Sequence, residues 1–177
     1  GSDVYQPRIA TPLAPNLRLE NPTLTDRGTD QSLVEAAVEF LRVSGNQRWF
    51  LYLHLMDLHE YIYDADSAQF GASHSDIYDN SILWTDGSLG ELIDSLAEMG
   101  QLDNTIVAIV SDHGEAFLER GIEGHARDVY PESTEVPFIL SLPFRLDPGV
   151  VVPMRTQNVD VWPRLYDLLG PEVPKVI

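Results

Sequence analysis

The sequence predicts an α/β fold in which helices flank a mostly parallel β-sheet. The chain has 177 residues, 44% of them hydrophobic, so it can bury a sizeable core as one domain or as part of a larger one. Three short apolar runs have the length of buried strands, and segments with the apolar spacing of helices lie among them. Such alternation is typical of sheets whose strands are mostly parallel.

The N-terminal segment, residues 1–28, contains four prolines and little periodicity, which predicts an extended arm rather than a core element. We expect the α/β domain to occupy residues 29–177. Its first helix begins near Ser32, because Ser32 and Glu35 have the spacing of a capping box. The helix ends at Gly45, a residue type that often follows a helix.

The remaining elements are predicted by apolar runs and by helical periodicity. Residues 49–56 are apolar almost throughout, which favours a strand buried on both faces, and residues 104–110 and 136–142 are similar runs. Apolar residues keep helical spacing over residues 78–99 and again over 158–169, and a glycine follows each segment. The predicted order is helix, strand, helix, strand, loop, strand, helix.

The charge balance limits the classes of partner. Asp and Glu total 28 against 11 Lys and Arg, a net charge of -17, so the chain repels phosphate backbones and we expect no nucleic-acid partner. No apolar run reaches the roughly 18–20 residues of a membrane span. The sequence has no cysteine, which excludes disulfides and thiolate metal sites within these residues. No targeting signal is visible in these residues, so a periplasmic, extracellular or cytoplasmic location stays open.

Chemically competent residues collect after the first two predicted strands. His54, Asp57, His59 and Glu60 lie at the end of the first run or just past it, and residues 111–115 follow the second run. In open α/β sheets, reactive groups gather at the carboxyl ends of the strands. With His125 downstream, four of the five histidines belong to this pattern. The clustering is the main functional signal of the sequence.

Asp112 and His113 form the sharpest candidate pair. A carboxylate and an imidazole side by side after a buried strand can turn toward one cation if the backbone bends there, and Gly114 would permit that bend. A mixed oxygen and nitrogen set suits Mn²⁺ or Zn²⁺, whereas Ca²⁺ prefers more oxygen ligands. The alternative is structural: Asp112 caps the next helix and His113 is a packed histidine.

His59 and His125 are candidates for contact with an anionic substrate. Each imidazole could meet a substrate oxygen as a hydrogen-bond donor or general acid. The alternative for His59 is a surface-loop histidine. For the other polar residues we favour ordinary roles: His54 as a core histidine, Asp57 and Glu60 as structural carboxylates rather than groups that orient a histidine, and Arg127 as a partner of a carboxylate rather than of an anion.

Several blocks occur together in an order that resembles the sulfatase family of the alkaline-phosphatase superfamily. The resemblance extends over about residues 48–174, and the ordered set is more specific than Ser-Asp-His-Gly alone. The blocks are residues 50–59, residues 78–96 with Asp86 and Gly90, residues 103–115, Gly124-His125, residues 135–138 and residues 159–163.

The resemblance implies a hydrolase of sulfate, phosphate or phosphonate esters that uses divalent cations and a formylglycine or threonine nucleophile. It implies that Asp112 and His113 are metal ligands from the C-terminal half of the site, with Ca, Mn or Zn as the cation. His59 resembles the histidine that contacts substrate oxygens. His125 occupies a place where relatives have Lys or His near the leaving group or the sulfuryl oxygens.

The sequence also departs from the family pattern. Relatives usually have Pro where this chain has Leu58, and the acidic ligands and nucleophile of the N-terminal half are not found here. We therefore expect the C-terminal half of a sulfatase-like domain, lacking its N-terminal half and inactive alone. The missing half would expose apolar surface, which predicts self-association. The alternative is a non-catalytic sulfatase-like binding or structural module.

Overall fold

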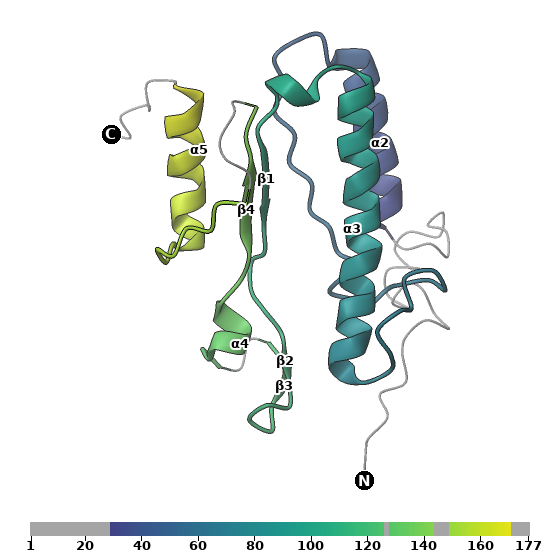
Figure 1. Cartoon of the computed structure of the whole chain (residues 1–177), viewed down its shortest axis with the longest axis vertical. Coiled ribbons are helices and arrows are strands. Elements are labelled where there is room, and N and C mark those ends of the chain that lie inside the picture. The colour runs from purple at the N-terminus through teal and green to yellow at the C-terminus, as the bar shows by residue number, and fades with distance from the viewer. Residues whose placement is uncertain (1–28, 126–127, 144–148, 171–177) are drawn as a thin grey trace, which may run out of the picture. The chain divides into compact units, whose positions relative to one another are not determined.

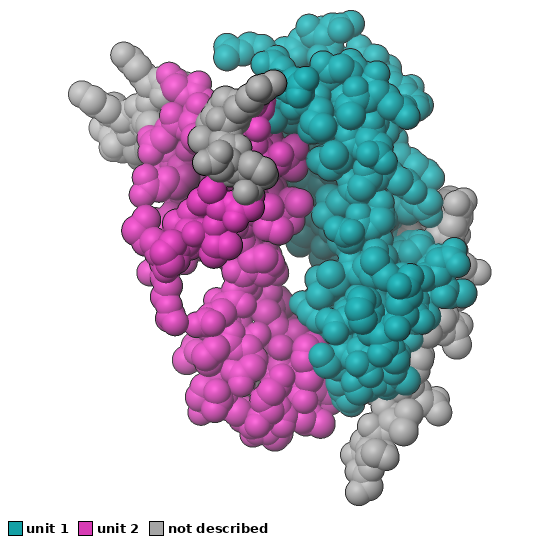
Figure 2. Space-filling view, viewed as in Figure 1, with its two compact units in different colours: residues 1–105 teal, residues 106–177 magenta. Residues whose placement is uncertain are grey.

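The computed structural model describes residues 29–125, 128–143 and 149–170, so the predicted arm 1–28 lies outside the described residues. The chain divides into two compact units, which are coloured in Figure 2. Unit 1 ends at Thr105 and unit 2 begins at Ile106. Among the described residues, no helix combines the length and the apolar character that crossing a membrane requires.

Unit 1 is built on two long helices that lie side by side, α2 (Asp30–Ser44) and α3 (His74–Glu98) (Figure 1). Both predicted helices are therefore present, and α3 begins earlier than expected because Ser73 and Asp76 form a capping box there. A short 3₁₀ turn, η2 (Leu102–Asn104), follows α3. The buried core of the unit lies between the helices and consists of Val34, Ala37, Val38, Leu41, Leu92 and Leu96.

The start of α2 is fixed by a residue far away in the sequence. The Asp57 carboxylate accepts hydrogen bonds from the backbone N–H groups of Thr29, at 2.7 Å, and Asp30, at 3.1 Å. Asp30 in turn accepts from the N–H groups of Met56 and Asp57. Both carboxylates are buried. The predicted capping box at Ser32 is therefore wrong: the helix starts two residues earlier, and Asp57 provides the cap.

Residues 49–56 do not form the predicted strand buried on both faces. Leu51 and Leu53 pack against the core of unit 1, whereas Phe50 and Tyr52 are 65% and 67% exposed. His54 continues this alternation and is exposed, and its ring lies 6.4 Å from that of Tyr52. The expectation that His54 is a core histidine is therefore also wrong. The segment is extended, and its side chains alternate between the helices and the surface.

Unit 2 contains two small antiparallel pairs. Strand β1 (Val107–Val110) pairs with β4 (Phe138–Ser141), with Val110 opposite Phe138. Strand β2 (Ala116–Phe117) pairs with β3 (Glu123–Gly124) in a hairpin. The predicted mostly parallel sheet is not found among the described residues, because both pairs are antiparallel. The described part of the link from β1 to β4 contains a hairpin and a one-turn helix, α4 (Pro131–Thr134), and not the longer helix that usually forms a parallel crossover.

The C-terminal part of unit 2 follows the prediction closely. A 3₁₀ turn, η3 (Asn158–Asp160), leads directly into the helix α5 (Val161–Leu169). The helix ends at Gly170, whose φ of 68° lies in the left-handed region that glycine adopts at little cost. The predicted strands 104–110 and 136–142 correspond to β1 and β4, so each of them is shorter than its apolar run.

Candidate functional site

The candidate site in unit 2 is built on the loop that follows β1. The Ser111 hydroxyl donates to the backbone carbonyl of His113 over 2.7 Å, which closes a tight local turn. The Asn158 side-chain amide donates to the carbonyls of both Ser111, at 3.1 Å, and Asp112, at 3.0 Å. The first residue of η3 therefore holds the backbone of this loop from a position more than forty residues along the chain.

Gly114 has a different role from the expected one. Its φ is not in the left-handed region, so its conformation does not require glycine. Instead, its N–H donates to the Ser133 carbonyl over 2.9 Å, and a Cβ atom at this position would collide with the carbonyl oxygen of Glu132. Position 114 requires glycine because the backbone of α4 passes directly beside it.

The side chains of Asp112 and His113 lie next to each other at the end of this loop. Asp112 Oδ2 is 3.7 Å from His113 Nε2, and Asp112 is 74% exposed. His113 Nδ1 lies 2.9 Å from the Gly114 carbonyl oxygen, which can only accept, so Nδ1 carries the ring proton. In the neutral ring, Nε2 then holds the lone pair that a cation would bind. Asp112 does not cap a helix, because the next helix is α4 and its N-cap is Tyr130.

His125 lies against His113. The two imidazole rings are stacked, with centroids 4.1 Å apart and planes at 26°. His125 Nδ1 is 3.0 Å from Oε2 of Glu115, whose side chain is only 8% exposed. Unit 2 therefore brings together three of the four predicted site residues, Asp112, His113 and His125, and adds Glu115, to which the sequence analysis assigned no role.

The β2–β3 hairpin explains why Glu115 meets His125. Ala116 pairs with Gly124, so the next position outward places Glu115 opposite His125 in the same register. Gly124 has a φ of 89°, a conformation that favours glycine, and a Cβ there would lie 3.4 Å from Glu115 Oε1. The contact between Glu115 and His125 follows from the hairpin register, which only the paired strands define.

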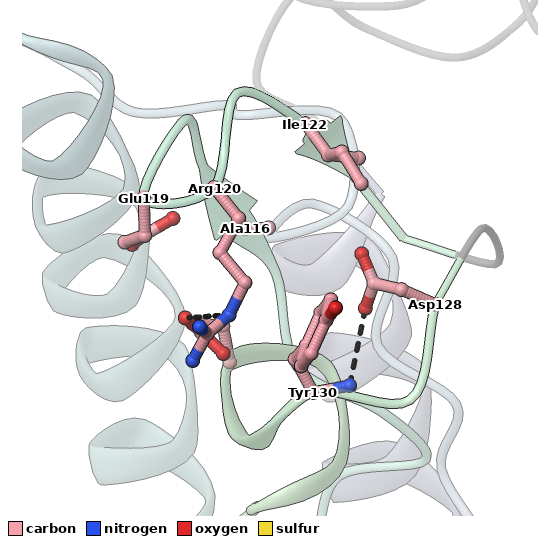
Figure 3. Close-up of a pocket in the computed structure, with 7 residues that line it drawn as sticks. Ala116, Glu119, Arg120, Ile122, Asp128 and Tyr130 are labelled. Atoms are coloured by element: carbon pink, nitrogen blue, oxygen red, sulfur yellow. Dashed lines mark hydrogen bonds and ion pairs between the residues drawn. The ribbon is translucent and has the colours of Figure 1, made fainter.

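A small hollow lies beneath the tip of the same hairpin (Figure 3). Arg120 extends from the tip over the ring of Tyr130, with its Cζ 4.2 Å from the ring centroid, and its Nε is 3.2 Å from Glu132 Oε1. The hollow has a volume of about 10 Å³, enough for a single water molecule and too small for an ester substrate. The contacts of Arg120 therefore hold the hairpin against α4 rather than binding a substrate.

The fourth predicted residue, His59, belongs to unit 1. Its Nδ1 is 3.3 Å from Glu60 Oε1, and its side chain is 45% exposed while that of Glu60 is 14% exposed. Glu60 therefore contacts a histidine, contrary to the purely structural role that we favoured for it. Asp57 has the structural role that we favoured, since its carboxylate binds the N-terminus of α2 and the Trp84 indole N–H. Arg127 lies outside the described residues.

The metal-ligating capacity of the described residues is limited. No group of three or more His, Asp or Glu side chains converges to hold a metal ion in the part of the chain that the structure describes. Asp112 and His113 nevertheless fit two ligands of one cation in the chemistry of their donor atoms, a carboxylate oxygen and an imidazole Nε2. Any further ligands would have to come from other residues or from solvent.

Comparison with known proteins identifies what the chain resembles. The model of the family described as Sulfatase matches residues 2–171. Steryl-sulfatase of Rattus norvegicus is 28% identical over 169 residues, 86% of this chain and 29% of that protein. Choline-sulfatase of Rhizobium meliloti is 35% identical over 99 residues, 56% of this chain and 19% of that protein. Arylsulfatase K of Xenopus laevis is 33% identical over 92 residues, 52% of this chain and 17% of that protein. The chain thus spans less than a third of the length of each of these relatives.

Proposed function

Because this chain belongs to the sulfatase family, we propose that it supplies the C-terminal part of the active site of a metal-dependent sulfate ester hydrolase. The relatives named above are a steryl-sulfatase, a choline-sulfatase and an arylsulfatase. The proposed substrate is a small anionic ester, and phosphate or phosphonate esters are the second choice. The strongly acidic composition fits a small substrate better than a nucleic acid.

One observation carries the proposal: Asp112 Oδ2 and His113 Nε2 lie 3.7 Å apart, while the other ring nitrogen of His113 is held by the Gly114 carbonyl. We propose these two atoms as cation ligands, with Ca, Mn or Zn as the ion. A divalent cation would supply charge that neutralises the ester's anionic oxygens. With only two ligands from this chain, its affinity for a cation in isolation should be weak.

The proposed contribution of the histidines is to bind the ester and assist the leaving group. His125 lies beside the Asp112–His113 pair, so a ligand of that pair would also be within reach of its imidazole. His59, oriented by Glu60, is proposed to contact substrate oxygens in the same family pattern. When protonated on both ring nitrogens, each imidazole can donate a hydrogen bond to a sulfuryl oxygen, or a proton to the departing oxygen.

We propose that the reaction requires a longer polypeptide than these residues. Covalent ester hydrolysis needs a nucleophile, and the family's Cys/Ser-x-Pro-x-Arg pattern is not found in this sequence. We therefore propose that the chain is inactive alone, and that residues beyond it complete both the cation site and the parallel sheet of the alkaline-phosphatase type. The second candidate is a non-catalytic sulfatase-like module that binds an anionic ligand, which the missing nucleophile pattern favours.

The proposal is tested by assaying hydrolysis of 4-nitrophenyl sulfate and 4-nitrophenyl phosphate with this chain and with the complete gene product. We expect the complete product to hydrolyse the esters, with the sulfate ester preferred, and this chain to hydrolyse neither. The Asp112→Ala variant of the complete product should lose turnover. Glu98→Ala, at an exposed position of α3, is the control and should keep full turnover. A complete product that hydrolyses neither ester would favour the non-catalytic module, and an active Asp112→Ala variant would refute the assignment of the cation ligand.

A further inference from the structure

We propose that Glu115 is a positioning residue that fixes the tautomer and the orientation of His125. Its carboxylate accepts a hydrogen bond from the Nδ1–H group of the imidazole, so that in the neutral ring the lone pair is on Nε2. The catalytic consequence of this assignment rests on the proposed function, but the tautomer itself does not. No motif of the sequence singled out Glu115, and its role follows from the geometry of the hairpin.

The contact has the features of a fixed hydrogen bond. Glu115 Oε2 lies 3.0 Å from His125 Nδ1, and the Glu115 side chain is only 8% exposed while that of His125 is 28% exposed. A carboxylate accepts hydrogen bonds when it is ionised, so the proton between the two atoms belongs to the ring. In a neutral histidine, the hydrogen bond of one ring nitrogen determines which nitrogen carries the proton.

The backbone leaves the two side chains little freedom to separate. The pairing of Ala116 with Gly124 and of Phe117 with Glu123 places Glu115 directly opposite His125 at the open end of the hairpin. At the closed end, Leu118 N–H donates to the Ile122 carbonyl over 3.1 Å, and this bond fixes the register. The strand pairing therefore positions the Glu115 carboxylate beside the His125 imidazole.

His113, which stacks on His125, is also held by a hydrogen bond at Nδ1, so the inference extends to both rings. His113 uses its Nδ1 to donate to the Gly114 carbonyl, and its ring lies 4.1 Å from that of His125. Both imidazoles are therefore anchored through Nδ1, one by a backbone oxygen and one by a carboxylate. In the proposed reaction, His113 would bind the cation through Nε2. His125 would act in its doubly protonated form, donating the Nε2 proton to the departing oxygen and returning to the neutral Nδ1–H ring.

The test is a direct reading of the His125 tautomer by NMR. The chain is labelled with ¹⁵N-histidine, and the ring nitrogens are observed at a pH where the imidazole is neutral, in the wild type, Glu115→Ala, Glu115→Gln and the control Glu123→Gln. We expect the Nδ1–H form in the wild type and in the control, whose exposed carboxylate lies on β3. Glu115→Gln should keep this form through its amide oxygen, and Glu115→Ala should shift the ring toward the Nε2–H form that water favours.

Two outcomes would overturn the inference: a wild-type His125 in the Nε2–H form, or an Nδ1–H form that persists in Glu115→Ala. The wild-type spectrum is decisive even if the alanine variant fails to fold. In the complete gene product, Glu115→Ala should lower kcat roughly tenfold or more with little change in KM, and Glu115→Gln should restore most of it. A product without esterase activity but with the predicted tautomer would refute only the proposed function. An active product whose Glu115→Ala variant keeps full kcat would refute the catalytic role of Glu115 alone.

Discussion

The imidazole rings of His113 and His125 are stacked, with their centroids 4.1 Å apart and their planes at 26°. His113 lies in the loop after β1, whereas His125 directly follows the β2–β3 hairpin, so the contact links the two parts of unit 2 that carry the proposed chemistry. Neither ring can move far without displacing the other, because each is also held by a hydrogen bond at Nδ1. The position of the proposed cation ligand is therefore coupled to that of the proposed acid.

A first prediction separates the chemistry of His125 from its packing. In His125→Asn, the side-chain amide lies close to the former Nδ1 and can still donate to Glu115, but no group replaces Nε2. We expect the free energy of unfolding to stay within about 1 kcal/mol of the wild type. Turnover of 4-nitrophenyl sulfate by the complete gene product should fall by about 10²-fold or more. Urea unfolding and steady-state kinetics measure the two effects, and full turnover in this variant would contradict the proposed role of His125.

A second prediction concerns the close approach at Gly114. In Gly114→Ala, the new methyl group collides with the Glu132 carbonyl oxygen, so the loop must move away from α4. We expect a loss of stability of about 1–3 kcal/mol, measured by urea unfolding. Gly87→Ala is the matched control, because no atom lies within 4 Å of a Cβ at this helical position. The control should gain about 0.5–1 kcal/mol, and equal effects of the two substitutions would show that position 114 is not crowded.

A third prediction is that the isolated chain self-associates. The two strands of the β1–β4 pair carry exposed apolar side chains, with Val110 at 42%, Ile139 at 54% and Leu140 at 36% exposure. Apolar strand surfaces promote pairing between chains, and a charge placed on them opposes it. Sedimentation velocity over a range of concentrations should show association that Ile139→Lys reduces. Val129→Lys, at an 86% exposed position outside the strands, is the control, and a compact monomer at every concentration would refute the prediction.

The sequence predicts those parts of the fold that depend on local patterns. The periodicity of apolar residues located α2, α3 and α5, and the strand-end rule directed attention to Asp112 and His113. The features it missed depend on contacts between distant residues. Asp57 caps a helix 27 residues before it, and a capping box suggested by local spacing was wrong for that reason.

The sequence also could not predict the direction of strand pairing or the contact between Glu115 and His125. Alternating elements suggested parallel strands, but β1 and β4 pair antiparallel, and the described part of the link between them contains a hairpin and a one-turn helix rather than a crossover helix. Glu115 lies beside Asp112 and His113 in the sequence and was still missed, because its partner His125 is defined by hairpin register. Register becomes visible only when both strands and the turn between them are known.

A fourth prediction follows from the contacts of Asp57. Its carboxylate accepts from two N–H groups at the start of α2 and from the Trp84 indole at 2.9 Å, and the residue is 1% exposed. Asp57→Ala leaves these buried donors without their acceptor, so we expect a loss of about 3 kcal/mol in unfolding free energy. Faster amide exchange in the first turn of α2 should accompany it. The control is Asp94→Ala, at an exposed position of α3, and a similarly small effect of both variants would contradict this capping role.

The last prediction is the pH dependence that Asp30 contributes. Burial, together with the nearby charge of Asp57, raises the pKa of the Asp30 carboxyl above its usual 3.8. The folded chain therefore holds this proton more tightly than the unfolded chain, and the contribution of Asp30 to stability is lost as the pH rises above 3.8 through the raised pKa. Asp30→Asn keeps an oxygen for the N–H groups of residues 56 and 57 and removes the charge. We expect this variant to be at least as stable as the wild type at pH 7, with a less negative slope of unfolding free energy against pH between 4 and 7.

The control is a carboxyl group whose pKa shifts in the opposite direction. The pKa of Asp64 is lowered by its hydrogen bonds from Ser67, so Asp64→Asn should change the slope only below about pH 4. Urea unfolding across this range measures both slopes, and an unchanged slope in Asp30→Asn would show that Asp30 titrates alike in the folded and unfolded chain.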